Sequence, residues 1–182
     1  MARILGTISS SFNESTSFFS IATFYSLGDQ TSFTFSNIPG TYTHLQLRCA
    51  LPGGNTVSST NFDIQINGDT GTNYANHWVG NNSTTIEVGA QANNPRIEEM
   101  VTFRSGNTSP AGVIMDFLDY ANTNKFKTMR TISGRMDATG GTTRITSHLW
   151  RSTSAITSVK VYPDNGNTFP PGCRIALYGI KG

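Results

Sequence analysis

The residues that most often do chemistry in proteins are histidines, serines and acids, and here their spacing fits no known catalytic or metal site. The three histidines, His44, His77 and His148, match neither the H-x-x-x-H nor the H-E-x-x-H spacing of zinc sites. Serines are abundant, but the chain contains no G-x-S-x-G elbow and no glycine-rich phosphate loop. We therefore predict no catalytic residue, no metal and no cofactor, and we expect that the protein is not an enzyme.

The eleven acids are spread along the chain rather than paired. Glycoside hydrolysis needs two carboxylic acids at a set separation, and in a strand Asp116 and Asp119 point to opposite faces. Residues 63–74 hold the densest group of oxygen ligands, which calcium would favour. They lack the EF-hand pattern, and Asn67 and Asp69 can bond their own backbone in a turn. We favour the turn over a calcium site.

Aromatic side chains offer a second kind of site, because their rings stack on sugars while Asn and Asp bind hydroxyl groups. Trp78 stands in a polar, loop-like stretch, whereas Trp150 ends a strand-like run and is predicted to lie in the core or an interface. The possible ligand or partner loop consists of Asn67, Asp69, Asn73, Tyr74 and Trp78.

The elements that position these residues are predicted from composition to be strands and turns. Ser, Thr, Asn and Gly supply 78 of the 182 residues, and only 13% are charged, against about 25% in a typical domain. Long amphipathic helices need Glu, Lys, Ala and Leu on their wet faces, so coiled coils are excluded. Thirteen basic and eleven acidic residues cannot form a broad basic field, so we expect no nucleic-acid partner.

Period-two alternation of apolar and polar residues recurs from residue 18 to the C-terminus. Residues 42–49, for example, place Leu45, Leu47 and Cys49 on one face. Turn signals such as Asn67-Gly68-Asp69 separate the runs. The pattern predicts an all-β fold, an antiparallel β-sandwich of about ten strands that is jelly-roll-like, with another Greek-key topology left open. Predicted strands cover residues 32–36, 42–49, 62–67, 85–89, 100–104, 112–118, 126–133, 143–150, 156–162 and 174–180.

Residues 94–100 could instead form one or two helical turns at the edge of the sandwich. Asn94 is a candidate N-cap and Pro95 suits the first helical position.

The first sixteen residues differ from the rest of the chain, and two interpretations remain open. Ile4, Leu5, Ile8 and Phe12 are apolar residues among serines. They could form an assembly arm that docks on a neighbouring subunit, or the first edge strand of the same domain. Residues 17–182 are predicted to form a single β-sandwich domain.

No stretch approaches the ~18 apolar residues of a membrane-spanning helix, and residues 1–9 are too short and polar for a signal peptide. We therefore expect no membrane partner and synthesis in a cytoplasm. In that reducing compartment, Cys49 and Cys173 are predicted to be buried thiols rather than a disulfide.

A set of short segments carries a resemblance to a known family. The segments are residues 19–23, 33–48 (FTFSNIPGTYTHLQLR), 67–69, 73–74, 155–159, Gly172 and 177–181. Together they resemble a pattern in tailed-bacteriophage virion structural proteins, including cyanophage-like ones, over about residues 17–182. The resemblance implies a short β-rich virion component and supplies no catalytic residues.

The resemblance and the compact size lead us to expect a head decoration (cement) protein. Such a protein is localised to the virion, forms a homotrimer, and binds the major capsid protein or other virion proteins. The alternative is a tail-associated or tail-fibre binding module that recognises host surface glycans through residues 67–82.

Overall fold

The computed structural model describes residues 17–52, 62–98, 100, 110–137 and 140–182. Within these residues all helix-or-strand structure is strand, and every strand pairing is antiparallel. The strands are β1 (Phe18–Tyr25), β2 (Phe33–Phe35), β3 (His44–Leu51), β4 (Phe62–Ile66), β5 (Tyr74–Asn82), β6 (Thr85–Asn94), β7 (Ala111–Leu118), β8 (Lys127–Asp137), β9 (Gly140–Trp150), β10 (Val159–Pro163) and β11 (Arg174–Ile180).

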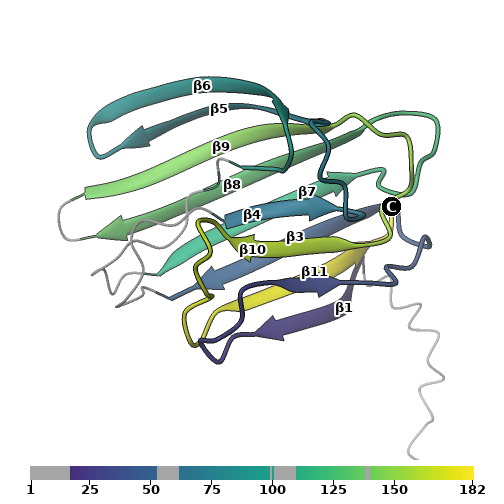
Figure 1. Ribbon diagram of the computed structural model, residues 1–182, viewed down its shortest axis with the longest axis horizontal. Coiled ribbons are helices and arrows are strands. Elements are labelled where there is room, and N and C mark those ends of the chain that lie inside the picture. The colour runs from purple at the N-terminus through teal and green to yellow at the C-terminus, as the bar shows by residue number, and fades with distance from the viewer. Residues whose placement is uncertain (1–16, 53–61, 99, 101–109, 138–139) are drawn as a thin grey trace, which may run out of the picture.

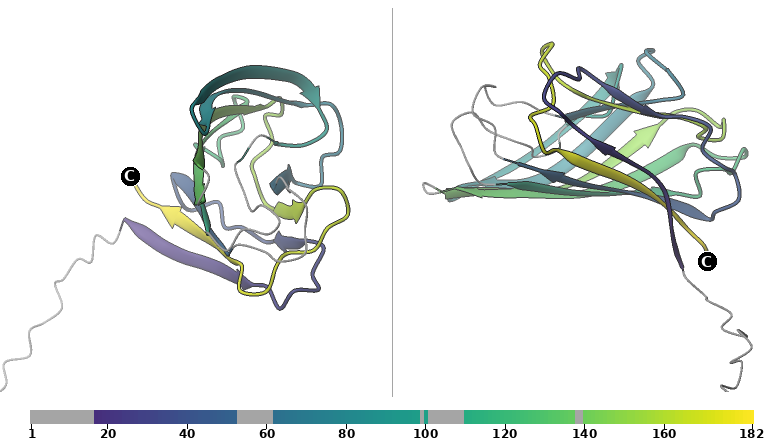
Figure 2. Two further views of the ribbon diagram at one scale, coloured as in Figure 1. Left: turned by 90° about the vertical axis from the view of Figure 1, so that its left-hand side faces the viewer. Right: turned by 90° about the horizontal axis from the view of Figure 1, so that it is seen from below.

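These strands form two sheets that face each other (Figure 1). The large sheet has eight strands in the order β1-β11-β3-β7-β8-β9-β5-β6, and the small sheet has three in the order β2-β10-β4. Figure 2 shows that the large sheet is curved, with β5 and β6 arching over the side that carries the small sheet. The structure confirms the all-β antiparallel sandwich, with eleven described strands where about ten were predicted. It does not confirm the jelly-roll topology.

The core lies between the sheets and follows the predicted alternation. In β3, Leu45, Leu47 and Leu51 are fully buried, whereas Arg48 between them is exposed. They belong to one buried cluster with side chains of the small sheet such as Val161. Truncating a buried Leu to Ala typically costs about 2–5 kcal/mol, so this cluster supplies much of the stability.

The turn predicted at Asn67-Gly68-Asp69 is present. Asn67 and Gly68 both have positive φ, and the backbone N–H of Asp69 donates to the carbonyl of Ile66 at 2.9 Å. Asn and Gly adopt this left-handed conformation at low cost, which suits a type I′ turn.

The prediction that residues 67–82 form a loop holds for residues 67–73 and is wrong from Tyr74 onward. Tyr74–Asn82 form β5, which pairs along its whole length with β6 on one side and β9 on the other. Asn and Gly in this segment have low intrinsic strand preference, but two neighbouring strands satisfy the backbone hydrogen bonds and override it.

The helical turns considered for residues 94–100 are absent from the described part of that segment. Asn94 ends β6, and Ile97 forms an isolated antiparallel bridge to Ile64 of β4, with N···O distances of 2.9 and 3.1 Å. The strand predicted for residues 100–104 falls almost wholly outside the described residues.

Cys49 and Cys173 are both buried and unbonded, as predicted. Burial raises the pKa of both thiols, that of Cys173 to about 12. Among the residues that the structure describes, none belongs to a helix able to span a membrane.

Candidate functional site

Four of the five predicted loop residues meet at the corner between β4 and β5. Asp69 is the centre of this corner: its carboxylate accepts from the Gly71 backbone N–H at 2.8 Å, from Asn73 Nδ2 at 2.9 and 3.2 Å, and from Trp150 Nε1 at 2.7 Å. Partial burial disfavours ionisation, but these donors together hold the pKa of Asp69 below its usual value. Each carboxylate oxygen is therefore already engaged by the chain itself.

Asn67 and Tyr74 are also used internally. The Asn67 side chain accepts from the backbone N–H groups of Thr157 and Ser158 at 2.8 and 3.0 Å and donates to the Ala155 carbonyl at 2.8 Å. The buried Tyr74 hydroxyl accepts from the Ile66 N–H at 3.0 Å and donates to the Asp69 carbonyl at 3.1 Å. The hydrogen bonds of Asn67 therefore connect the segment before β10 to the end of β4.

Trp78, the fifth predicted residue, lies apart from this corner, four residues along β5. It faces the small-sheet side, where a Cβ on Gly89 would lie 2.0 Å from its Cζ2 atom and where Arg144 sits 5.6 Å from its ring centroid. The predicted apolar arm residues Ile4, Leu5, Ile8 and Phe12 lie outside the described residues.

Sequence reasoning missed an ionic cluster at the outer edge of the small sheet. Asp63 of β4 is 2% exposed, and Arg96 lies with its Nε 2.9 Å from Asp63 Oδ2 and its Nη2 2.5 Å from Glu98 Oε1. Burial, aided by the charges of Glu98 and Asp164, raises the pKa of Asp63 to about 7 against the opposing effect of Arg96. The bridge between Ile64 and Ile97 brings these groups together, so strand alternation alone gave no signal of it.

A second buried polar group lies on the inner side of the large sheet. His148 of β9 is 1% exposed, with Nε2 3.0 Å from the hydroxyl of the equally buried Thr131. Burial lowers the pKa of His148 to about 3, so the ring is neutral at pH 7. Both side chains are therefore almost fully shielded from solvent. In the described part of the chain no cluster of His, Cys, Asp and Glu is able to hold a metal ion.

The outer face of the large sheet, turned away from the small sheet, carries the most distinctive surface. Ile114 of β7 pairs with Ile132 of β8, which pairs with Ile145 of β9, then Val79 of β5 and Val88 of β6. We call these five in-register residues the apolar row. Their exposed fractions run from 46% to 73%. Val113 and Met115, which flank Ile114 in β7, point into the core. A shift of the strand register by one residue would exchange the two faces, so the present register keeps the apolar row on the surface.

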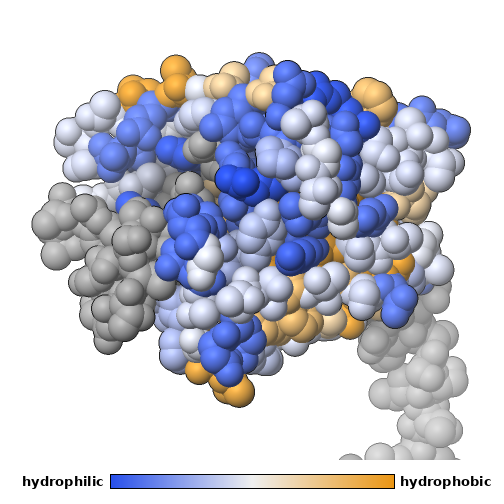
Figure 3. Space-filling model, viewed as in Figure 1, coloured by the Kyte–Doolittle hydropathy of each residue, from blue (hydrophilic) through white to orange (hydrophobic). Residues whose placement is uncertain are grey.

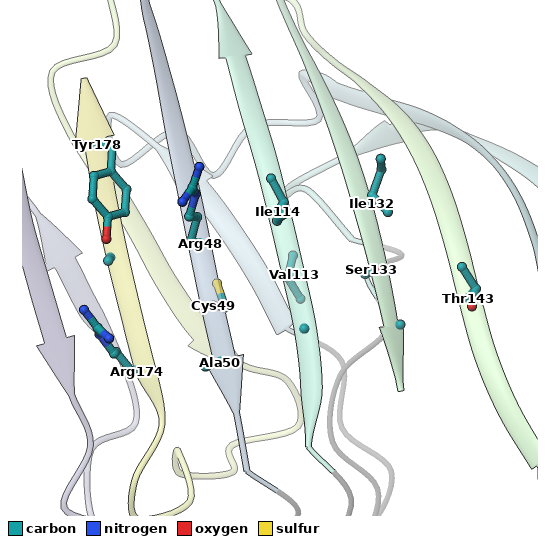
Figure 4. A pocket seen from close by; sticks show the side chains of 13 residues that line it. Arg48, Cys49, Ala50, Val113, Ile114, Ile132, Ser133, Thr143, Arg174 and Tyr178 are labelled. Atoms are coloured by element: carbon teal, nitrogen blue, oxygen red, sulfur yellow. The ribbon is translucent and has the colours of Figure 1, made fainter. Parts of the chain in front are cut away.

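A hollow of about 590 Å³ lies beside the apolar row (Figure 4). Its floor includes Gly112 of β7 and its cross-strand partner Gly134 of β8. A Cβ added at Gly112 would have no atom within 4 Å, so the missing side chain leaves open space. Ile114 and Ile132 stand on one rim, and Arg48, Arg174 and Tyr178 stand along the other.

The two arginines make this rim positively charged. The Arg48 guanidinium lies 5.1 Å from the ring centroid of Phe18 and 5.4 Å from that of Tyr178, and Arg174 lies 5.7 Å from that of Tyr25. Within the described residues neither arginine forms an ion pair with a carboxylate. The hollow therefore combines apolar walls with two positive charges that lack acidic partners there.

The opposite face of the molecule differs from this one. Viewed from the side of the small sheet, the described surface is mostly hydrophilic, with apolar residues gathered near its edges (Figure 3). The molecule thus presents one polar face and one face with an apolar row and a hollow.

Comparison of the chain with models of protein families, with curated proteins and with solved structures found no match.

Proposed function

We propose that this protein is a non-enzymatic structural protein of a phage virion, a head decoration (cement) protein that stabilises the capsid shell. In this proposal it is a jelly-roll-like homotrimer that binds the major capsid protein or other virion proteins. The family resemblance of residues 17–182 suggests the virion.

The observation that carries the proposal is the apolar row with its neighbouring hollow. Soluble monomers rarely expose contiguous apolar patches beyond a few hundred Å², and larger ones mark surfaces that meet other macromolecules. The low charge of the chain supports the same role, since Ser, Thr and Asn side chains lose less on burial in an interface than charged groups do. Many modest contacts on a repeating lattice then add up through avidity.

The polar residues that could do chemistry offer little support for catalysis. Asp69 and Asn67 are bound by their own chain, and His148 and Thr131 are buried. The predicted glycan loop is likewise occupied by internal hydrogen bonds, which favours the head protein over a tail-associated glycan-binding module.

Cryo-electron microscopy of purified particles tests the proposal. Antibody or tag labelling of this protein should give copies spread over the head lattice, in a number set by the capsid symmetry. Copies only at the tail tip, joined by binding on a glycan array, would support the tail-associated module instead. Absence from particles would reject both.

A further inference from the structure

We propose that residues 1–16 of a second copy of this chain cover the outer face of the large sheet, with Phe12 seated in the hollow and Glu14 between Arg48 and Arg174. This inference deepens the proposed assembly role and rests on it, because it names the contact through which copies associate. Four observations support this occupant: the pattern of the segment, its charge, its length and the place from which it leaves the fold.

The residue pattern of the segment suits an extended chain on an apolar surface. Ile4, Ile8 and Phe12 have the same parity, so in an extended conformation they point to one side. The eight residue-to-residue steps from Ile4 to Phe12 span about 26 Å in an extended chain. The four strand spacings from Gly112 of β7 to Val88 of β6 span about 19 Å on a flat sheet. On the convex side of a curved sheet the path is longer, so the three side chains can follow the apolar row.

The charge of the segment complements the rim of the hollow. Glu14 is the only acid in the first 28 residues, and it lies two residues after Phe12 on the same side of an extended chain. With Phe12 above Gly112, the Glu14 carboxylate lies about 7 Å along the chain, within reach of long arginine side chains on the rim. An arginine–carboxylate pair partly shielded from water would fix the register of the segment.

The direction of β1 at its first residue favours a contact with another copy. Phe18 pairs with Ile180, at the end of the sheet that Figure 2 shows flaring away from the small sheet. The hollow is level with Tyr25, at the opposite end of β1, through the pairs Tyr25–Arg174, Arg174–Ala50 and Ala50–Gly112. A chain that continues the direction of β1 therefore moves away from its own hollow. Sixteen residues reach at most about 55 Å, enough to cross the roughly 34 Å width of eight strands in a neighbour.

Sedimentation equilibrium of the full-length protein and three variants tests this contact. The wild type should self-associate, and Phe12→Ala and Gly112→Val should each weaken association at least about tenfold. Gly112→Val places an apolar side chain in the hollow, at a position where an added Cβ meets no atom within 4 Å. The double variant should be little weaker than either single variant, since both remove one contact.

Gly40→Val is the matched control. A Cβ there also meets no atom within 4 Å, φ is not positive, and Gly40 does not line the hollow. Its association should equal that of the wild type, and unchanged thermal unfolding in all variants would show that folding is intact.

Charge exchange tests the second half of the contact. Glu14→Arg and Arg48→Glu should each weaken association, and the two together should restore it at least in part. Lys160→Glu, on β10 of the small sheet, changes charge equally and should have no effect.

A photo-cross-linking amino acid, p-benzoylphenylalanine, at position 12 identifies the occupied surface directly. In a mixture of isotopically light and heavy protein, cross-links should join position 12 of one copy to β7 or β8 of the other. A monomeric wild type, cross-links confined to one chain, or additive effects of Phe12→Ala and Gly112→Val would overturn the inference.

The virion role and the contact made by residues 1–16 can be rejected independently of each other. Copies on phage heads together with a monomeric purified protein would reject the arm contact alone. A protein that associates through residues 1–16 but is absent from particles would reject the virion role alone.

Discussion

At the scale of single residues, two buried titratable groups respond to pH in opposite directions. Burial raises the pKa of Asp63 to about 7 and lowers the pKa of His148 to about 3. Because the pKa of Asp63 is raised, the folded state keeps this proton over a pH range in which the unfolded state has lost it. Because the pKa of His148 is lowered, the unfolded state binds a proton over a pH range in which the folded state does not. Between about pH 4 and 6.5 the two contributions oppose each other, so their sum should change the free energy of unfolding little over this range.

Asp63→Asn should expose the histidine contribution. The raised pKa of Asp63 adds to the stability of the folded protein below about pH 4, and this contribution is lost as the pH rises through about 7. An amide at position 63 does not titrate, so the variant lacks this pH-dependent contribution. Its free energy of unfolding should then fall on acidification from pH 6.5 to 4.5 by up to about 1.4 kcal/mol per pH unit more steeply than in the wild type. Urea unfolding at several pH values measures this, with the exposed Asp29→Asn as control. Parallel profiles of Asp63→Asn and wild type would contradict the pKa of Asp63.

His148→Gln should have the converse effect. The buried neutral ring favours unfolding as pH falls below 6.5, because only the unfolded state takes up the proton. Without it, stability should rise on acidification from pH 6.5 to 4.5, by up to about 1.4 kcal/mol per pH unit relative to the wild type. The same urea series measures the change, and His77→Gln, an exposed histidine of β5, is the control. A profile identical to that of the wild type would show that His148 is not buried as a neutral ring.

At the scale of elements, the corner between β4 and β5 and the outer face of the large sheet have different roles. The corner joins β4, β5 and the segment before β10 through side-chain hydrogen bonds of Asn67, Asp69 and Tyr74. The outer face is made by register: β-branched residues at matching positions in five strands form one row. The corner stabilises the fold, whereas the outer face of the large sheet is exposed and can contact another molecule.

Two substitutions at Asn67 distinguish the contribution of its side-chain hydrogen bonds to stability from that of its backbone conformation. Asn67→Gly keeps the positive φ of 53° accessible and removes only the hydrogen bonds to residues 155–158, so we expect a loss of about 1–3 kcal/mol. Asn67→Ala adds backbone strain of roughly 1 kcal/mol or more. Thermal unfolding of both variants measures the order. Equal stability of Asn67→Gly and wild type would show that the corner is not held by this side chain.

Ile132→Thr combined with Ile145→Thr tests the apolar row. Both residues are more than half exposed and Thr retains β-branching, so the free energy of unfolding should change by less than about 1 kcal/mol. Self-association, in contrast, should weaken. Leu47→Ala in β3 is the contrasting core variant and should lose about 2–5 kcal/mol. Association unchanged in the double Thr variant would show that the row is not a contact surface.

At the scale of the whole molecule, the described domain closes its core without the first sixteen residues. The buried cluster begins with Phe24, and the pairing of β1 with β11 begins at Phe18. The face on the side of the small sheet is mostly hydrophilic (Figure 3), whereas the outer face of the large sheet carries the apolar row. The two faces therefore differ in what they can contact.

Deleting residues 1–16 should therefore leave a folded domain whose free energy of unfolding changes by less than about 1 kcal/mol. If the protein has the proposed virion role, its attachment to heads should be weaker, because the segment proposed to hold copies together is gone. Circular dichroism with thermal unfolding measures the first effect, and occupancy on purified heads measures the second. Heads occupied as fully by the truncated protein as by the intact one would reject the role of the segment.

The amino-acid sequence alone was enough to predict the fold class and much of the core. Alternation placed Leu45 and Leu47 inward, and the Asn67-Gly68 turn followed from the freedom of these two residues to adopt positive φ, because both are local properties of the chain. Only the folded arrangement shows that the Asn-rich segment 74–82 is a strand between two others, because besides its hairpin partner β6 it pairs with β9, which is distant in the sequence. It also decided that Asp63 is buried against Arg96, and that Ile114, Ile132 and Ile145 form one row, because strand order and register set which residues become neighbours.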